Sequence, residues 1–159
     1  MKGTTVVLGV TGGIAAYKTV ELASLLVKRG ASVHVVMTEA ATRFVAPLTF
    51  RTISGNPVSC QMFEDPGVWN VKHIGLAERA DIMVVAPATA NFVGKASQGI
   101  ADDLLTTVIM ATQAPRLIVP SMNEAMYENP VVQQNLNRLR DLGYDVMEPG
   151  SGYLACVKE

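Results

Sequence analysis

Small or polar residues follow three apolar segments of the chain, and several of their side chains are suited to hydrogen bonding with a ligand. They are Thr11 and Gly12, Thr89 and Asn91, and Ser121 and Asn123. Hydroxyl and amide groups donate and accept hydrogen bonds without carrying a charge. Asn123 also stands between Met122 and Met126, whose soft apolar side chains can cover a flat ligand. One such segment is equally typical of a turn or a helix cap, but three together indicate a binding site.

A pair of glycines, Gly12 and Gly13, separates the first apolar segment from a helical pattern that begins at Ile14. Glycine lets the backbone approach a ligand closely, and the amino end of a helix favours an anion such as phosphate. The spacing is not the Gly-x-Gly-x-x-Gly of dinucleotide-binding turns. Thr38 follows the second apolar segment, where an NAD site would present an acidic residue to the ribose. The turn therefore favours a phosphate or ribityl group, with a tight structural turn as the alternative.

Two further side chains could move protons. Histidine is the side chain whose ordinary pKa lies nearest neutral pH, which makes His73 the candidate acid–base group if it reaches the site, and a structural histidine is the alternative. Cys156 could donate a proton or act as a nucleophile, or it could be an inert thiol. Neighbours on a helix point about 100° apart. The adjacent carboxylates of Asp102 and Asp103 therefore do not form a catalytic pair, and we interpret them as charges at a helix start or as interface contacts. We interpret His34 as a packed or edge residue.

The elements that must position these residues alternate between apolar strands and amphipathic helices. Strands are predicted at residues 5–10, 33–37, 82–86, 117–119 and 145–147, and the clearest helices at residues 14–28 and 131–142. This alternation predicts parallel strands joined by right-handed crossovers. We expect one α/β domain over residues 1–159, with a three-layer Rossmann-like (flavodoxin-like) fold whose parallel sheet is covered by helices on both faces. The polar segments would then meet at one edge of the sheet.

The composition argues against several classes of protein. The 159 residues are 49% apolar and 17% charged and carry a net charge of −1, which is typical of a globular domain and gives no support for binding nucleic acid or an anionic membrane. No apolar run is long enough to span a bilayer. Two histidines without zinc-like spacing argue against a metal site. Cys60 and Cys156 make no disulfide framework, so we expect a reducing compartment and a cytoplasmic location.

Six motifs together resemble those of the homo-oligomeric flavin-containing cysteine decarboxylases. They are GGIAAYK at residues 12–18, HI at 73–74, PATAN at 87–91, GIADDLL at 99–105, PSMN at 120–123 and LAC at 154–156. The match runs in order over nearly the whole chain. The combination is specific, although no single motif is.

The resemblance implies a carboxy-lyase that binds FMN, without a covalent link, at the contact between protomers of a homotrimer or a homododecamer. By match, the FMN-binding residues are Gly12, Gly13, Ile14, Thr38, Thr89, Ala90, Asn91, Phe92 and Ser121. The resemblance further implies oxidative decarboxylation of the cysteinyl group of 4′-phosphopantothenoylcysteine through a thioaldehyde. Reduction to 4′-phosphopantetheine, a precursor in coenzyme A biosynthesis, would follow.

The same resemblance implies a role for each remaining candidate. His73 would be the base for the oxidation, and Cys156 would protonate the enethiol carbon in the final reduction. Asn123 would hold the substrate's carboxylate or amide. The substrate-binding residues by match are Met122, Asn123, Leu154 and Ala155. Residues 150–159 would begin a mobile clamp over the substrate, and a frayed terminus is the alternative.

Other functions of related proteins are alternatives. A peptidyl-cysteine decarboxylase would act on the carboxyl-terminal cysteine of a peptide, but that branch lacks a match to Cys156. A flavin prenyltransferase of the same fold is disfavoured by His73 and by residues 120–123. A non-catalytic flavin-binding role would require neither His73 nor Cys156. The resemblance also implies a phosphopantothenate–cysteine ligase, as a further domain or a separate protein, as a partner.

Overall fold

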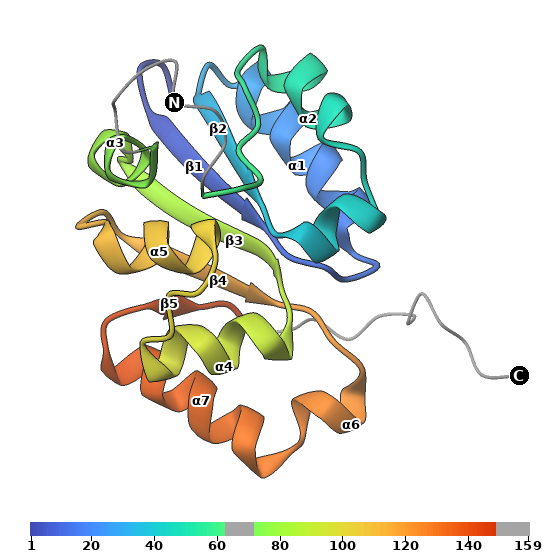
Figure 1. Cartoon of the computed structure of the whole chain (residues 1–159), viewed down its shortest axis with the longest axis vertical. Helices are drawn as coiled ribbons and strands as arrows, with labels where there is room; N and C mark the ends of the chain where they lie inside the picture. Colours follow the sequence, from blue (N-terminus) through green and yellow to red (C-terminus); the bar gives the residue numbers. More distant parts are fainter. Residues whose placement is uncertain (63–71, 149–159) are drawn as a thin grey trace, which may run out of the picture.

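The computed structural model describes residues 1–62 and 72–148, in which five parallel strands form one sheet in the order β2-β1-β3-β4-β5 (Figure 1). The strands are β1 (Thr5–Val10), β2 (Ser32–Met37), β3 (Ile82–Ala88), β4 (Arg116–Pro120) and β5 (Asp145–Val146). Each lies where the sequence predicted a strand, with ends that differ by no more than two residues. The predicted parallel sheet is therefore confirmed.

Helices connect these strands. They are α1 (Ala16–Lys28), the 3-10 helix η1 (Glu39–Arg43), α2 (Pro47–Ser54), α3 (Lys72–Arg79), α4 (Ala90–Gln98), α5 (Leu104–Ala111), α6 (Glu124–Tyr127) and α7 (Pro130–Asp141). α1 ends as predicted, because Gly30 adopts a φ of 86° that L-amino acids with side chains disfavour. α7 starts with Pro130 in its first turn, where the missing N–H costs nothing. Over residues 1–62 and 72–148, none of these helices is both long and apolar enough to cross a membrane.

The helices form a layer on each face of the sheet, which confirms the three-layer fold (Figure 1). α1, η1 and α2 pack on one face, where Leu8, Met37 and Phe50 are fully buried. α3, α4, α5 and α7 cover the other face, over a core that includes Met83 and Leu105. Burying side chains of this size contributes roughly 1.5–3 kcal/mol each. This apolar packing holds the strand ends in fixed positions.

The strand order creates a change of direction between β1 and β3. From β1 the chain passes to β2 on one side, and it then crosses to β3 on the other side of β1. In an open parallel sheet a crevice forms at such a point, beyond the carboxyl ends of the strands, and ligands bind there. The segments that follow β1 and β3 border this crevice. The same edge holds the segment after β4, since Ser121 N donates to Ala88 O at 3.0 Å.

Candidate functional site

A cavity of about 990 Å³ lies at the carboxyl ends of β1, β3 and β4. Its lining includes all three of the polar segments that the sequence predicted to meet at this edge. They contribute Thr11, Gly12, Gly13, Ile14, Ala15, Thr89, Ala90, Asn91, Phe92, Ser121, Met122 and Asn123. Thr38 lines the cavity as well. Binding sites for small molecules have volumes of about 300–1,000 Å³, so this cavity can hold a large cofactor.

The turn at Gly12 and Gly13 leaves no room for a side chain at Gly12, for a reason that the sequence did not reveal. A Cβ atom on Gly12 would lie 2.4 Å from Ala40 Cβ and 2.9 Å from the Ala40 carbonyl carbon. A Cβ on Gly13 would lie 3.4 Å from Thr89 Cγ2, which is an ordinary contact. Close approach to a ligand was the expected reason for both glycines. At Gly12 the close neighbour is the chain itself, since the turn is pressed against η1.

Three uncharged polar residues of the cavity also cap helices. Thr38 Oγ1 accepts from Ala41 N at 3.3 Å, and Thr89 Oγ1 accepts from Phe92 N at 3.4 Å. Asn123 Oδ1 accepts from Ala125 N at 2.9 Å. These residues therefore line the cavity and also start the helices around it. α1 and α4 also begin at its wall, where the positive end of each helix dipole favours a negative charge.

Charged residues occupy part of the wall. Lys95 Nζ lies 2.8 Å from an oxygen of Asp102 and 3.6 Å from one of Asp103. Its hydrogen bond to Asp102 raises the pKa of Lys95 and lowers the pKa of Asp102. Asp103 caps α5, because its Oδ1 accepts from Thr106 N at 2.8 Å while Thr106 Oγ1 accepts from Asp103 N at 3.1 Å. The interpretation of these aspartates as helix-start charges is confirmed for Asp103.

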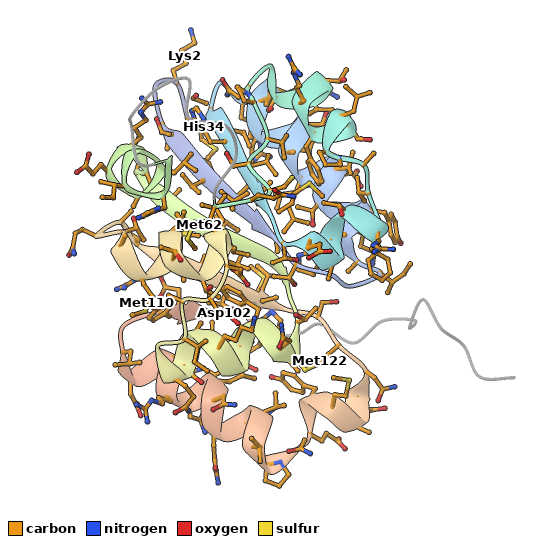
Figure 2. All side chains as sticks on the ribbon, in the orientation of Figure 1. Lys2, His34, Met62, Asp102, Met110 and Met122 are labelled. Carbon is orange, nitrogen blue, oxygen red and sulfur yellow. The ribbon has the colours of Figure 1, made fainter. Side chains whose placement is uncertain are left out.

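The two histidines lie away from the cavity wall. His73 is half-buried on α3, and it is not one of the residues that line the cavity. His34 is half-buried in β2, and burial, with a smaller effect of Arg79, lowers its pKa. Figure 2 places Met122 beyond the carboxyl end of β4 and His34 toward the other end of the sheet. Within one copy of the chain, the predicted base is therefore not brought to the predicted cofactor site.

The rest of the predicted substrate site falls outside the described residues. Leu154, Ala155 and Cys156 belong to residues 149–159, as does the predicted clamp over residues 150–159. Their roles stay predictions.

Several cavity residues were not predicted from the sequence. They are Ala15, Tyr17, Lys18, Glu39, Ala40, Arg43, Lys95 and Asp103. Thr11 and Met126, which the sequence placed among the ligand-facing residues, also line the cavity. Helical periodicity could have found one of the unpredicted residues. Lys95 follows Asn91 by four residues within α4, so it lies one turn further along the same helix face. The residues of η1 carried no comparable signal, because their helix was not predicted.

Comparisons with known proteins agree with this geometry. The model of the flavoprotein family matches residues 1–159. The coenzyme A biosynthesis bifunctional protein CoaBC of Bacillus subtilis is 50% identical over 151 residues, which is 95% of this chain and 37% of that protein. CoaBC of Escherichia coli is 44% identical over 156 residues, which is 98% of this chain and 38% of that protein. The chain thus spans about two fifths of the length of these curated relatives.

Solved structures give the same result. The FMN-dependent cysteine decarboxylase SpaF superimposes with a TM-score of 0.88 at 34% identity, over 94% of this chain and 86% of that one. A mutant of PPC decarboxylase in complex with pantothenoylaminoethenethiol superimposes with a TM-score of 0.83 at 30% identity, over 98% of this chain and 86% of that one. The resemblance drawn from the six motifs is confirmed, and the chain belongs to the flavoprotein family.

Proposed function

We propose that this chain is an FMN-dependent carboxy-lyase of coenzyme A biosynthesis that decarboxylates 4′-phosphopantothenoylcysteine. One observation carries the proposal. The three polar segments that follow β1, β3 and β4, with the Gly12–Gly13 turn, line one cavity at the point where the strand order changes direction. The similarity to CoaBC proteins and to PPC decarboxylase supports the choice of substrate.

The residues of the cavity fit FMN. A flavin needs a flat apolar space with polar groups at its rim and an anion site for its phosphate. Phe92, Met122 and Met126 supply apolar surface, and the amino end of α4 offers N–H groups. We assign FMN binding to Gly12, Gly13, Ile14, Thr38, Thr89, Ala90, Asn91, Phe92 and Ser121. When bound, FMN would supply the two-electron oxidation of the cysteinyl unit and the later return of those electrons.

Asn123 is suited to hold the substrate's carboxyl end as a donor. Its Oδ1 is engaged by Ala125 N, whereas no hydrogen bond to a described residue uses its Nδ2. The amide is exposed beside Met122 on the cavity wall. An Nδ2–H donor and an apolar neighbour together would orient a carboxylate that is about to leave as carbon dioxide.

The position of His73 supports a site shared between subunits. Because His73 does not line the cavity of its own chain, we propose that it enters the cavity of a neighbouring copy in a homotrimer or homododecamer. Exposed apolar side chains surround both regions: Ile14 is 50% exposed and Tyr17 55% at the cavity, and Ile74 is 44% exposed next to His73. A subunit contact would cover these surfaces. His73 would then take a proton from the substrate as general base.

The carboxyl-terminal residues complete the proposal. Cys156 would return a proton to the enethiol carbon, with Leu154 and Ala155 beside the substrate and residues 150–159 closing over it. The bifunctional CoaBC relatives support a phosphopantothenate–cysteine ligase as a linked or separate partner. A reducing cytoplasm would suit the free thiol of such a donor.

The rival substrate is a peptide that ends in cysteine, since the structural relatives include the peptidyl-cysteine decarboxylase EpiD, with a TM-score of 0.81 at 26% identity. The test incubates the FMN-loaded chain with 4′-phosphopantothenoylcysteine or with a cysteine-ended peptide and measures product masses. We expect loss of carbon dioxide and formation of 4′-phosphopantetheine from the first substrate. Turnover of the peptide alone would contradict the proposal.

Two variants separate the roles within this reaction. His73→Asn should bind FMN and lose decarboxylation, whereas the control His34→Asn should keep both. Mixing His73→Asn with Asn123→Asp before reassembly should restore part of the activity if each site takes its residues from two copies. An absence of complementation in mixed oligomers would refute the shared site.

A further inference from the structure

We propose that Thr11 is a positioning residue that ties the two walls of the cofactor cavity together; this inference rests on the proposed binding of FMN. Thr11 is 2% exposed and follows β1 directly, at the change of strand direction. It lines the cavity, yet its hydroxyl forms its hydrogen bonds with the segment at the end of β3.

The Thr11 hydroxyl makes two hydrogen bonds across the crevice. Its Oγ1 donates to Pro87 O at 2.6 Å and accepts from Thr89 N at 3.1 Å. The backbone adds a third link, since Thr11 N donates to Pro87 O at 3.3 Å. One side chain therefore joins the segment after β1 to the end of β3 and to the N-cap of α4. These partners are 76 and 78 residues away in sequence.

The segments joined in this way are the ones assigned to the cofactor. Gly12 and Gly13 follow Thr11 on one side, and Thr89 precedes Ala90 and Asn91 on the other. Without the hydroxyl, Pro87 O would keep its bond from Thr11 N, but Thr89 N would lose the acceptor it has here. An amide N–H left without a partner in a part-buried site is unfavourable, so the α4 start would move to find one. The cavity would then widen or tilt on that side.

Thr19 provides a matched control. It is 3% exposed, and its Oγ1 donates to Ala86 O at 2.8 Å, the carbonyl that precedes Pro87. It lies in α1 and is not one of the cavity-lining residues. Thr11→Val and Thr19→Val both replace a buried hydroxyl that donates to the end of β3 by a methyl group. A purely structural role predicts the same consequences for both.

The experiment measures FMN affinity by the change of flavin fluorescence on titration, together with urea unfolding of each variant. We expect Thr11→Val to bind FMN about tenfold more weakly than wild type, and Thr19→Val to bind it as wild type does. Thr11→Ser should restore the affinity because it keeps the hydroxyl. Equal affinity of Thr11→Val and wild type, equal losses in the two valine variants, or no rescue by serine would each overturn the inference.

Two further outcomes have a different meaning: a wild type that binds no FMN, and a Thr11→Val variant that does not fold. If wild type bound no FMN, the proposed function itself would fail, and Thr11 would lose its role with it. If Thr11→Val did not fold, Thr11→Ala and Thr11→Ser would replace it, since both remove the methyl group and only serine keeps the hydroxyl. An alanine variant that binds FMN as tightly as the serine variant would then refute the positioning role.

Discussion

Replacing Gly12 by alanine should destabilise the fold even in the absence of any ligand. The added Cβ would lie 2.4 Å from Ala40 Cβ and 2.9 Å from the Ala40 carbonyl carbon, and real Cβ atoms essentially never come this close to other atoms. The backbone of η1 would have to move, since Ala40 has no flexible end that could yield. Inserting one carbon into a tightly packed contact typically costs about 1–3 kcal/mol. For a chain of this size, about 2 kcal/mol lowers Tm by roughly 4–8 °C.

Gly13→Ala is the control for this prediction. Its Cβ would lie 3.4 Å from Thr89 Cγ2, so the free energy of unfolding should be unchanged or increase by up to about 1 kcal/mol through the less flexible unfolded chain. Ala40→Gly should recover part of the Gly12→Ala loss, because it removes the nearer of the two contact atoms. Urea unfolding of the four variants, the double mutant included, measures the coupling. Equal unfolding free energies for Gly12→Ala and Gly13→Ala, or no coupling with Ala40, would refute the reasoning.

Two further predictions concern stability. Asp103→Ala should lower the free energy of unfolding by about 1 kcal/mol through loss of the α5 cap. Urea unfolding should show a smaller effect for Asp102→Ala, which leaves the cap intact. Equal effects of the two substitutions would contradict the assignment of the cap to Asp103. The folded-state pKa of His34 is lowered from 6.5, so below pH 6.5 the unfolded chain takes up the proton more readily and the folded state loses stability as the pH falls. His34→Gln should lose less stability than wild type between about pH 8 and about pH 5.5, and an identical loss would exclude His34 as the source.

Hydrophobic pattern was sufficient to predict the sheet. The strands are apolar on both faces because helices cover them, so β1 was predicted with its correct limits and β2 to within one residue. β3 continues through Pro87 to Ala88, beyond its predicted end at Ala86. Proline lacks an N–H for the ladder and is uncommon inside strands. In the structure Pro87 lies next to the last residue pair between β3 and β4, and its carbonyl oxygen accepts a hydrogen bond from Thr11.

The short helices and the wall contacts were beyond the reach of the sequence pattern. η1 has five residues and α6 has four, too few to show a helical period. The contact of Gly12 with Ala40 joins residues of different elements, and only the packing of η1 on the turn creates it. The role of Thr11 likewise depends on a partner in β3, which a pattern local to β1 does not contain.

The candidate site also contains residues that the sequence pattern could place and one that it could not. Thr89, Asn91 and Asn123 were predicted at one rim, because carboxyl ends of parallel strands meet at one edge of a sheet. His73 could not be placed by that rule. It lies on a helix that precedes its strand, and a position relative to another copy of the chain has no signature in the pattern.

The central claim is that this cavity binds FMN and serves the decarboxylation of 4′-phosphopantothenoylcysteine. The most direct measurement follows release of labelled carbon dioxide from substrate labelled in its cysteinyl carboxyl group, with the chain and FMN present. The account predicts carbon dioxide release that requires FMN, matches the substrate consumed and is lost in His73→Asn. Tight FMN binding without any release of label, or release at the same rate without FMN, would contradict it.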